Sequence, residues 1–224
     1  MQNVSELSKH VQEAISNWEM ESLSLAGFQF LNSGTSIKLS YNQIEQLVSL
    51  TNSNIHCYLG LENETLKFYF LSDSDDHKRQ YTNIIETQFE ADNLGQFNNY
   101  TFGISGNSEL TLQEAGSRVL NWVFEGSIWF NEQKKNQYPM VRVFTIPKVD
   151  LESALENNKA PIKLCFGLKK NTSGETSSKY MLELIVGFAR PISTTTVGSL
   201  FLSNLTHPHP PFSISEDSFT LLEI

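Results

Sequence analysis

Two histidines near the C-terminus have the spacing of a possible metal site. His207 and His209 flank Pro208 in the stretch LTHPHPPF. Two imidazoles this close could share a transition metal, provided that a third ligand comes from elsewhere in the chain. Pro208, Pro210 and Pro211, however, favour an extended, polyproline-like segment that leads into the last strands. We favour this second interpretation, and we expect no metal or other cofactor.

An acidic run is the second candidate for ligand chemistry. Asp73, Asp75 and Asp76 lie close together in SDSDDHKR, and carboxylates at this spacing could hold a hard cation. The run lacks the glycine and the distal glutamate of an EF-hand loop. We therefore expect a solvated turn that closes the preceding hairpin.

The third candidate is the adjacent pair His56 and Cys57, whose residue types are those of a base and a nucleophile. Neighbouring residues of a strand point to opposite faces, so the two cannot act on one another. In a repeated pattern described below, His56 aligns with Lys163, which indicates a solvent-facing position, and Cys57 aligns with Leu164, which indicates a core position. We expect no catalysis by Cys57, and we expect Cys57 and Cys165 to be buried, reduced thiols.

The motifs of common enzyme classes are missing from the sequence. There is no phosphate-binding Gly-x-x-x-x-Gly-Lys loop and no Gly-x-Gly-x-x-Gly, and GISG at Gly103 to Gly106 is one residue too short for a nucleophile elbow. Neither His-Glu-x-x-His nor Cys-x-x-Cys occurs, so no zinc motif is recognisable. These absences disfavour standard nucleotide enzymes and α/β-hydrolases.

Composition indicates a folded, acidic protein. The 224 residues are 39% hydrophobic and 11% aromatic, which is enough to build a core. The net charge of −9 disfavours nucleic-acid binding, because the average surface repels phosphate. The N-terminal stretch lacks the basic start and apolar run of a secretory signal, and no segment approaches the ~18 apolar residues of a membrane span. We expect a soluble, cytoplasmic protein.

A repeated pattern gives the clearest architectural signal. IHCYLGL at Ile55 to Leu61 and IKLCFGL at Ile162 to Leu168 share an apolar frame and a Gly-Leu ending. The same offset of 107 residues pairs apolar positions on both sides of them without a gap. The pairs are Ile37 with Phe144, Leu39 with Ile146, Ile44 with Leu151, Val48 with Leu155, Ile55 with Ile162, Gly60 with Gly167 and Leu61 with Leu168.

Each copy reads as a helix, a strand, a short helix and a hairpin of two strands. This order predicts an α+β protein made by internal duplication of an α-β-α-β-β unit, with one shared sheet or two packed sheets, mixed or antiparallel. We expect an exposed hairpin tip at 169–179. The expected divisions are a first unit at 1–72, a connecting segment at 73–110, a second unit at 111–190 and a proline-containing C-terminal segment at 191–224.

The helix expected at 111–133 carries more apolar surface than one buried face requires. A capping box of Thr111 and Glu114 begins it, and Lys134 and Lys135 suit its C-terminal end. We expect burial on two sides, either within the chain, which we favour, or against a second subunit. The residues that extend beyond the main apolar stripe are Leu120, Val123, Phe124, Ile128 and Phe130.

The strand endings YLGL and FGL, followed by the hairpin strands KFYFL and LELIV, resemble a segment of uncharacterised bacterial proteins, some of them from Bacteroidetes. The resemblance covers about 30 residues in each copy. It implies a bacterial protein and a similar local fold, and it implies no catalytic residue.

The sequence leaves two classes of function open. The favoured one is a non-enzymatic, intracellular binding or assembly protein with an unidentified protein partner, for example an immunity- or antitoxin-like factor that neutralises a basic protein. We favour a monomer over a homodimer. The alternative is an enzyme of unfamiliar type with a cleft between the two copies. Apolar side chains filling that space would weaken the alternative.

Overall fold

The structure is a computed structural model of the chain. It describes residues 2–51, 53–90, 103–104, 110, 112–158, 161–171, 178–188, 201–203, 207–209 and 219–222.

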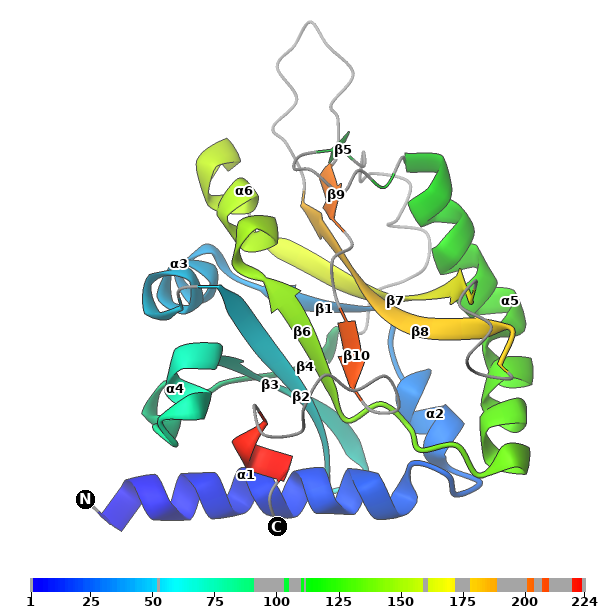
Figure 1. Ribbon diagram of the computed structural model, residues 1–224, viewed down its shortest axis with the longest axis horizontal. Coiled ribbons are helices and arrows are strands. Elements are labelled where there is room, and N and C mark those ends of the chain that lie inside the picture. Colours follow the sequence, from blue (N-terminus) through cyan, green and yellow to red (C-terminus); the bar gives the residue numbers. More distant parts are fainter. Residues whose placement is uncertain are drawn as a thin grey trace, which may run out of the picture.

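The described residues form one curved sheet with helices around it, which confirms the expected α+β class (Figure 1). The strand order is β10-β6-β2-β3-β4-β1-β7-β8-β9-β5, and every pair is antiparallel except β5 with β9. The strands are β1 (Ser36–Leu39), β2 (Asn54–Glu62), β3 (Thr65–Ser72), β4 (Ile85–Glu90), β5 (Gly103–Ile104), β6 (Val143–Pro147), β7 (Ile162–Lys170), β8 (Tyr180–Phe188), β9 (Phe201–Ser203) and β10 (His207–His209). The helices are α1 (Gln2–Glu21), α2 (Gly27–Leu31), α3 (Tyr41–Leu50), α4 (Asp73–His77), α5 (Leu112–Asn136) and α6 (Lys148–Asn158), with 3-10 turns η1 (Tyr81–Asn83) and η4 (Thr220–Leu222).

Local sequence explains several of these boundaries. Ser40 caps α3, because its hydroxyl accepts a bond from the Gln43 backbone while the Gln43 side chain accepts one from the Ser40 backbone. The hairpin of β2 and β3 turns at Asn63 and Glu64, which both have positive φ, as a two-residue hairpin turn of the primed type requires. Thr111 and most of the predicted hairpin tip, 172–177, lie outside the described residues.

The first strand of each half pairs with the hairpin of the other half. Strand β1 pairs with β7, placing Ile37 opposite Leu164, while β6 pairs with β2, placing Phe144 opposite Cys57. Phe144 follows Ile37 by 107 residues, and Leu164 follows Cys57 by 107 residues. The two contacts therefore have the same register. The connecting segment supplies β4, which joins β3 to β1. The halves are therefore interlocked in one sheet.

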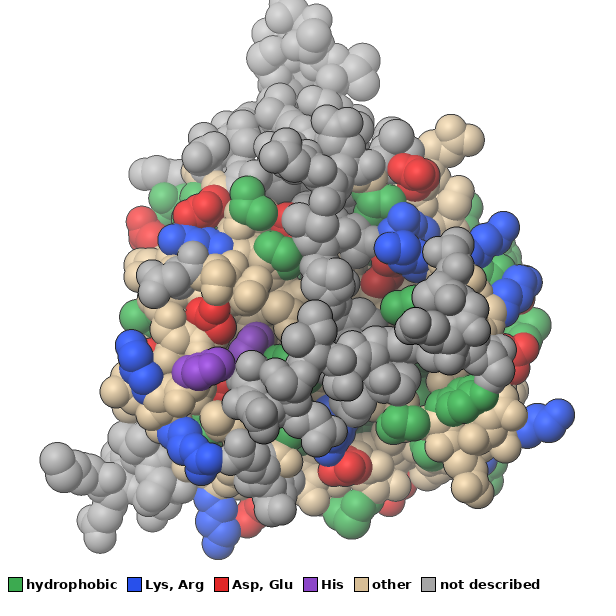
Figure 2. All heavy atoms as spheres, in the orientation of Figure 1, with side chains coloured by type: hydrophobic (Ala, Val, Ile, Leu, Met, Phe, Trp, Pro, Cys, Tyr) green, Lys and Arg blue, Asp and Glu red, His purple; other side chains and the backbone are tan. Residues whose placement is uncertain are grey.

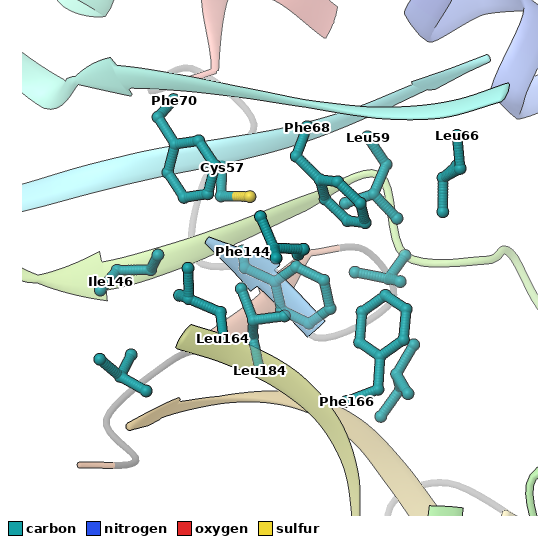
Figure 3. Packing of buried hydrophobic residues seen from close by; sticks show 14 of the residues in the cluster. Cys57, Leu59, Leu66, Phe68, Phe70, Phe144, Ile146, Leu164, Phe166 and Leu184 are labelled. Carbon is teal, nitrogen blue, oxygen red and sulfur yellow. The ribbon is translucent and has the colours of Figure 1, made fainter. Parts of the chain in front are cut away.

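Apolar side chains fill the space between the two halves. Figure 3 shows side chains of β2, β3 and β6 pointing toward those of β7 and β8. At the centre lies Phe166, whose ring centroid is 6.2 Å from that of Phe68, 6.1 Å from that of Phe144 and 5.4 Å from that of Trp122. These four residues are at most 7% exposed. The interior is thus a packed core.

The outer faces of the sheet are covered by different helices in the two halves. Helix α1 packs against β2 and β3 through Val11, Ala14 and Ile15, and α5 packs against β7. Ala14 lies so close to β2 that a Cβ added at Gly60 would be 3.0 Å from the Ala14 carbonyl carbon. Strand β2 has no bulge at Gly60, because Leu59 and Leu61 on either side of it keep their regular partners Phe68 and Leu66 in β3.

The expectation that α5 is buried on two sides within the chain is wrong for four of the five residues named for the second side. Phe130 is buried, at 3% exposed, and packs against Phe28 of α2. Phe124 is 72% exposed, and Leu120, Val123 and Ile128 are more than half exposed. The sheet accepts one stripe of α5, and the structure places no other described element over the opposite side. Figure 2 shows hydrophobic side chains reaching the surface at the right-hand edge, where α5 runs in Figure 1.

Within the described residues, no helix combines the length and the apolar character needed to cross a bilayer.

Candidate functional site

The structure brings together two of the candidate groups, His56 of β2 and Asp76 of α4. Helix α4 begins directly after β3, where the Ser72 hydroxyl accepts a bond of 3.0 Å from the backbone N–H of Asp75. This single helical turn directs Asp76 back onto the outer face of β2. Asp76 is completely buried, and His56 is 4% exposed.

The Asp76 carboxylate is the centre of a hydrogen-bonded cluster. Its Oδ2 atom lies 2.6 Å from Nδ1 of His56 and accepts a bond from the Tyr58 hydroxyl. Its Oδ1 atom accepts from the backbone N–H of Thr220 at 3.2 Å and lies 2.5 Å from the Thr220 hydroxyl. Phe219 covers the His56 ring, with ring centroids 4.8 Å apart. We call His56, Tyr58, Asp76 and Thr220 the Asp76 cluster.

The Asp76 cluster joins three segments that are distant in sequence. Strand β2 supplies His56 and Tyr58, helix α4 supplies the carboxylate, and the C-terminal turn η4 supplies Thr220. The Tyr81 and Thr220 hydroxyls are a further 2.8 Å apart, which connects η1 to the same turn. The cluster therefore holds the C-terminal end of the chain against the first half of the sheet.

The three acidic side chains do not form the expected solvated turn. Asp75 and Asp76 are buried, and the Asp75 carboxylate accepts a bond of 2.9 Å from the Asn83 amide. Asp73 accepts bonds from Thr51 at 2.5 Å and from the Ser53 hydroxyl. Each carboxylate has different partners, so the run does not converge on one cation position. In the described part of the chain, no group of three or more His, Cys, Asp or Glu residues could hold a metal ion.

The hydrogen bonds of Asp73 also shift its titration. Burial by itself would raise the pKa of this carboxyl group, but the hydrogen bonds from the Ser53 and Thr51 side chains and from the Asn54 and Ser74 backbone together outweigh that effect. The pKa of Asp73 is therefore lowered, and the carboxylate form is stabilised.

The expectation that His56 faces solvent is wrong, and the sequence contained a signal against it. Tyr58 lies two residues after His56 and so shares its face of β2, and an aromatic residue there indicates that this face is covered too. The acidic run suggests a metal ligand at Asp76, whereas the partner of Asp76 is a histidine 20 residues earlier. No local pattern connects the two residues, because β3 lies between them.

The two cysteines are buried, as expected. Cys57 points into the packed core (Figure 3). His56, its neighbour in β2, therefore points to the opposite face of the strand. Burial raises the pKa of the Cys57 thiol well above its ordinary value and raises that of Cys165 to about 12. Both side chains are therefore neutral thiols at physiological pH, which is an unreactive form.

The His56–Asp76 contact resembles the base and orienting carboxylate of nucleophilic enzymes, but its surroundings do not suit catalysis. The Tyr58 hydroxyl, which meets the same carboxylate oxygen as His56, donates to Asp76. Burial, followed by the nearby Asp76 charge, raises the pKa of Tyr58 well above its ordinary value. The geometry supports a structural connection that excludes water.

His207 and His209 lie in strand β10, which pairs with β6 and places Pro208 opposite Phe144. The expected polyproline-like segment is therefore replaced at 207–209 by a short strand. The side chains of these residues lie outside the described part of the structure.

A groove of about 650 Å³ opens beside β1, β4 and the start of α3. Glu90 lies at this groove and forms ion pairs with Lys38 at 3.4 Å and Lys163 at 3.5 Å. These pairs connect the first half of the sheet to the second, since Lys38 and Lys163 are opposite one another on β1 and β7. The residues lining the groove are Lys38, Ser40, Gln43, Thr87, Gln88, Phe89 and Glu90.

The chain was compared with protein-family models, with curated proteins and with solved structures, and none of these matches it.

Proposed function

We propose that this chain is a non-enzymatic binding or assembly protein whose docking surface is the solvent face of α5. The observation that carries the proposal is the exposed apolar stripe of Leu120, Phe124 and Ile128, with Val123 beside it. Of the eight large hydrophobic side chains that are exposed in the described part of the chain, four belong to this helix. Apolar residues gathered on one face of a folded protein mark an interaction site more often than scattered ones do.

The packing of the sheet favours binding over catalysis. An enzyme with its cleft between the two halves needs open space there, and the side chains around Phe166 occupy that space. The Asp76 cluster, the most catalytic-looking arrangement among the described residues, is closed to solvent. A rigid scaffold with one apolar face is well suited to docking, because little side-chain and backbone freedom is lost on binding.

We also propose that the scaffold arose by duplication of an α-β-α-β-β unit. The order α1, β1, α3, β2, β3 recurs as α5, β6, α6, β7, β8, with the short α2 added in the first half. The crossed contacts of β1 with β7 and of β6 with β2 keep the same register under the 107-residue offset. A bacterial, cytoplasmic setting, and a basic partner of the immunity or antitoxin type, are consistent with the resemblance and with the charge of −9.

Affinity capture tests the docking surface. Tagged wild-type chain and the Phe124→Asp variant are each incubated with a lysate of the source organism, and proteins retained in stoichiometric amounts are identified. Met20→Asp is a matched control, because Met20 is 70% exposed and lies on α1. We expect a partner that the wild type and Met20→Asp retain and Phe124→Asp loses. Equal retention by all three proteins would contradict a docking site on α5.

A further inference from the structure

We propose that the occupant of the α5 surface is a second copy of the same chain, packed antiparallel, α5 against α5, about a two-fold axis at Phe124. This inference rests on the proposed binding function and names the partner. It follows from the composition of the exposed face and from the charges at its two ends.

The solvent face of α5 is a continuous row along the whole helix. Its members follow one another at spacings of four and three residues, and all of them are exposed, whereas Ala115, Trp122 and Trp129 on the opposite face are buried. The row consists of Gln113, Ser117, Leu120, Phe124, Ile128, Asn131 and Lys135.

The row is self-complementary about its central residue. A two-fold interface requires that a residue at one position meet a compatible residue at the mirror position. In an antiparallel pair centred on Phe124, Leu120 lies opposite Ile128 of the second copy, and Ser117 lies opposite Asn131. Apolar side chains thus meet apolar ones at the centre, and polar side chains meet polar ones at the rim.

Charge selects the antiparallel direction. The first turn of α5 contains the acidic Glu114, and its last turn contains the basic Lys134 and Lys135. An antiparallel pair brings Lys135 of one copy beside Glu114 of the other, and it also opposes the two helix dipoles favourably. A parallel pair would instead place the lysines of both copies together. The same charges therefore favour one arrangement and disfavour the other.

The expected dimer is weak and concentration-dependent. The apolar part of the row, from Leu120 to Ile128, extends over about 12 Å of helix at 1.5 Å per residue. A contact this short is smaller than a standard stable interface, so the α5 pair forms a reversible dimer unless other surfaces add to it.

Disulfide trapping tests the arrangement at residue level. Helices packed ~9 Å apart, with Cα atoms ~2.3 Å from each axis, bring facing Cα atoms to ~4.4 Å, which is within disulfide range. The native Cys57 and Cys165 are buried and do not compete. We expect Phe124→Cys to form a disulfide-linked dimer under mild oxidation, while the equally exposed control Met20→Cys stays monomeric.

A pair of variants tests the direction of packing. Gln113→Cys by itself should not link, because its own counterpart lies ~33 Å away along an antiparallel pair. A mixture of Gln113→Cys with Lys135→Cys should link. Sedimentation equilibrium of the untreated proteins should show a dissociation constant at least tenfold higher for Phe124→Asp than for the wild type.

Three outcomes would overturn the inference. They are a wild-type chain that stays monomeric at all concentrations, a dimer that Phe124→Cys does not trap, and linking of Gln113→Cys to itself. A monomeric wild type that still captures another protein through Phe124 would retain the docking surface and reject the second copy. A monomer whose captured proteins are indifferent to Phe124→Asp would reject both.

Discussion

Helices α1 and α5 cover corresponding strands in the two halves of the sheet, yet they present different surfaces to solvent. The exposed side of α1 is mainly polar, with Lys9, Glu13 and Asn17, and its exposed apolar residues Leu7 and Met20 lie far apart. The exposed side of α5 carries Leu120, Phe124 and Ile128 in one row. Both helices bury an apolar stripe against the sheet, so packing accounts for only one face of each. The difference on the other face is not required by the fold, and it is there that we expect the function to lie.

The polar contacts that anchor the two halves differ as well. In the second half, Nη1 of Arg118 on α5 donates to both carboxylate oxygens of Glu183 on β8, at 3.2 and 3.1 Å. In the first half, the Asp76 cluster, whose residues are at most 6% exposed, takes the corresponding role and connects a different element, the turn η4. A buried carboxylate with several partners is costly to disturb, so the first half should depend more strongly on a single polar residue.

The largest expected effect is that of Asp76→Ala. The change leaves His56, Tyr58 and Thr220 without their shared acceptor, and we expect the free energy of unfolding to fall by about 3–5 kcal/mol. Urea denaturation followed by circular dichroism measures the loss. Asp75→Ala, which removes the contact with Asn83, should cost about 1–3 kcal/mol. Similar losses for the two variants would show that the Asp76 cluster stabilises the fold no more than the contact between Asp75 and Asn83 does.

The two faces of α5 can be separated by substitutions two residues apart. Trp122→Ala removes a ring that is 7% exposed in the main core, and we expect a loss of about 3–5 kcal/mol. Phe124→Ala removes a ring that is 72% exposed and should change the stability of the monomer by less than ~0.5 kcal/mol. The measurement is urea denaturation at low protein concentration. A large loss for Phe124→Ala there would mean that this ring belongs to the core.

The glycines shared by the two halves provide a third test. A Cβ added at Gly60 would be 2.7 Å from Cε2 of the Tyr69 ring, 2.9 Å from the Ala14 Cβ and 3.0 Å from the Ala14 carbonyl carbon. A Cβ at Gly167 would mainly meet the end of the Ile185 side chain, at 2.6 Å. Backbone cannot move aside as a side-chain terminus can, so Gly60→Ala should destabilise by about 1–3 kcal/mol and Gly167→Ala by less. Equal thermal stability of the two variants would indicate that α1 does not pack closely against β2 at Gly60.

The smallest predicted effect is a pH dependence due to Cys165. Its pKa is raised by burial from 9.0 to about 12, so the unfolded chain loses the thiol proton first as the pH rises. Titration of the thiol therefore leaves the free energy of unfolding unchanged below about pH 9 and lowers it between about pH 9 and 12. At pH 10 the expected loss is about 1.4 kcal/mol relative to Cys165→Ala, after subtracting their difference at pH 7. A constant difference between the two proteins from pH 7 to 10 would contradict burial of the thiol.

Local sequence determined most of the secondary structure. The apolar runs of β2 and β3, the capping box at Ser40 and the two-residue turn at Asn63 and Glu64 are short-range features, and each acts within a few residues of itself. The offset of 107 residues also follows from the sequence, and with it the recurring order of strands and helices. The buried positions of Cys57 and Cys165 could be predicted because both lie in apolar strands.

Only the tertiary structure decided which of these elements touch. The crossed pairing of β1 with β7 and of β6 with β2 joins residues more than 80 positions apart, and strand patterns by themselves do not identify a distant partner. For the same reason the sequence pattern predicts a solvent-facing His56 and a surface turn at Asp76, whereas α4 and η4 cover both residues in the folded chain. The exposed face of α5 was likewise decided by packing, because a helix that is apolar on several sides does not reveal which side the sheet will cover.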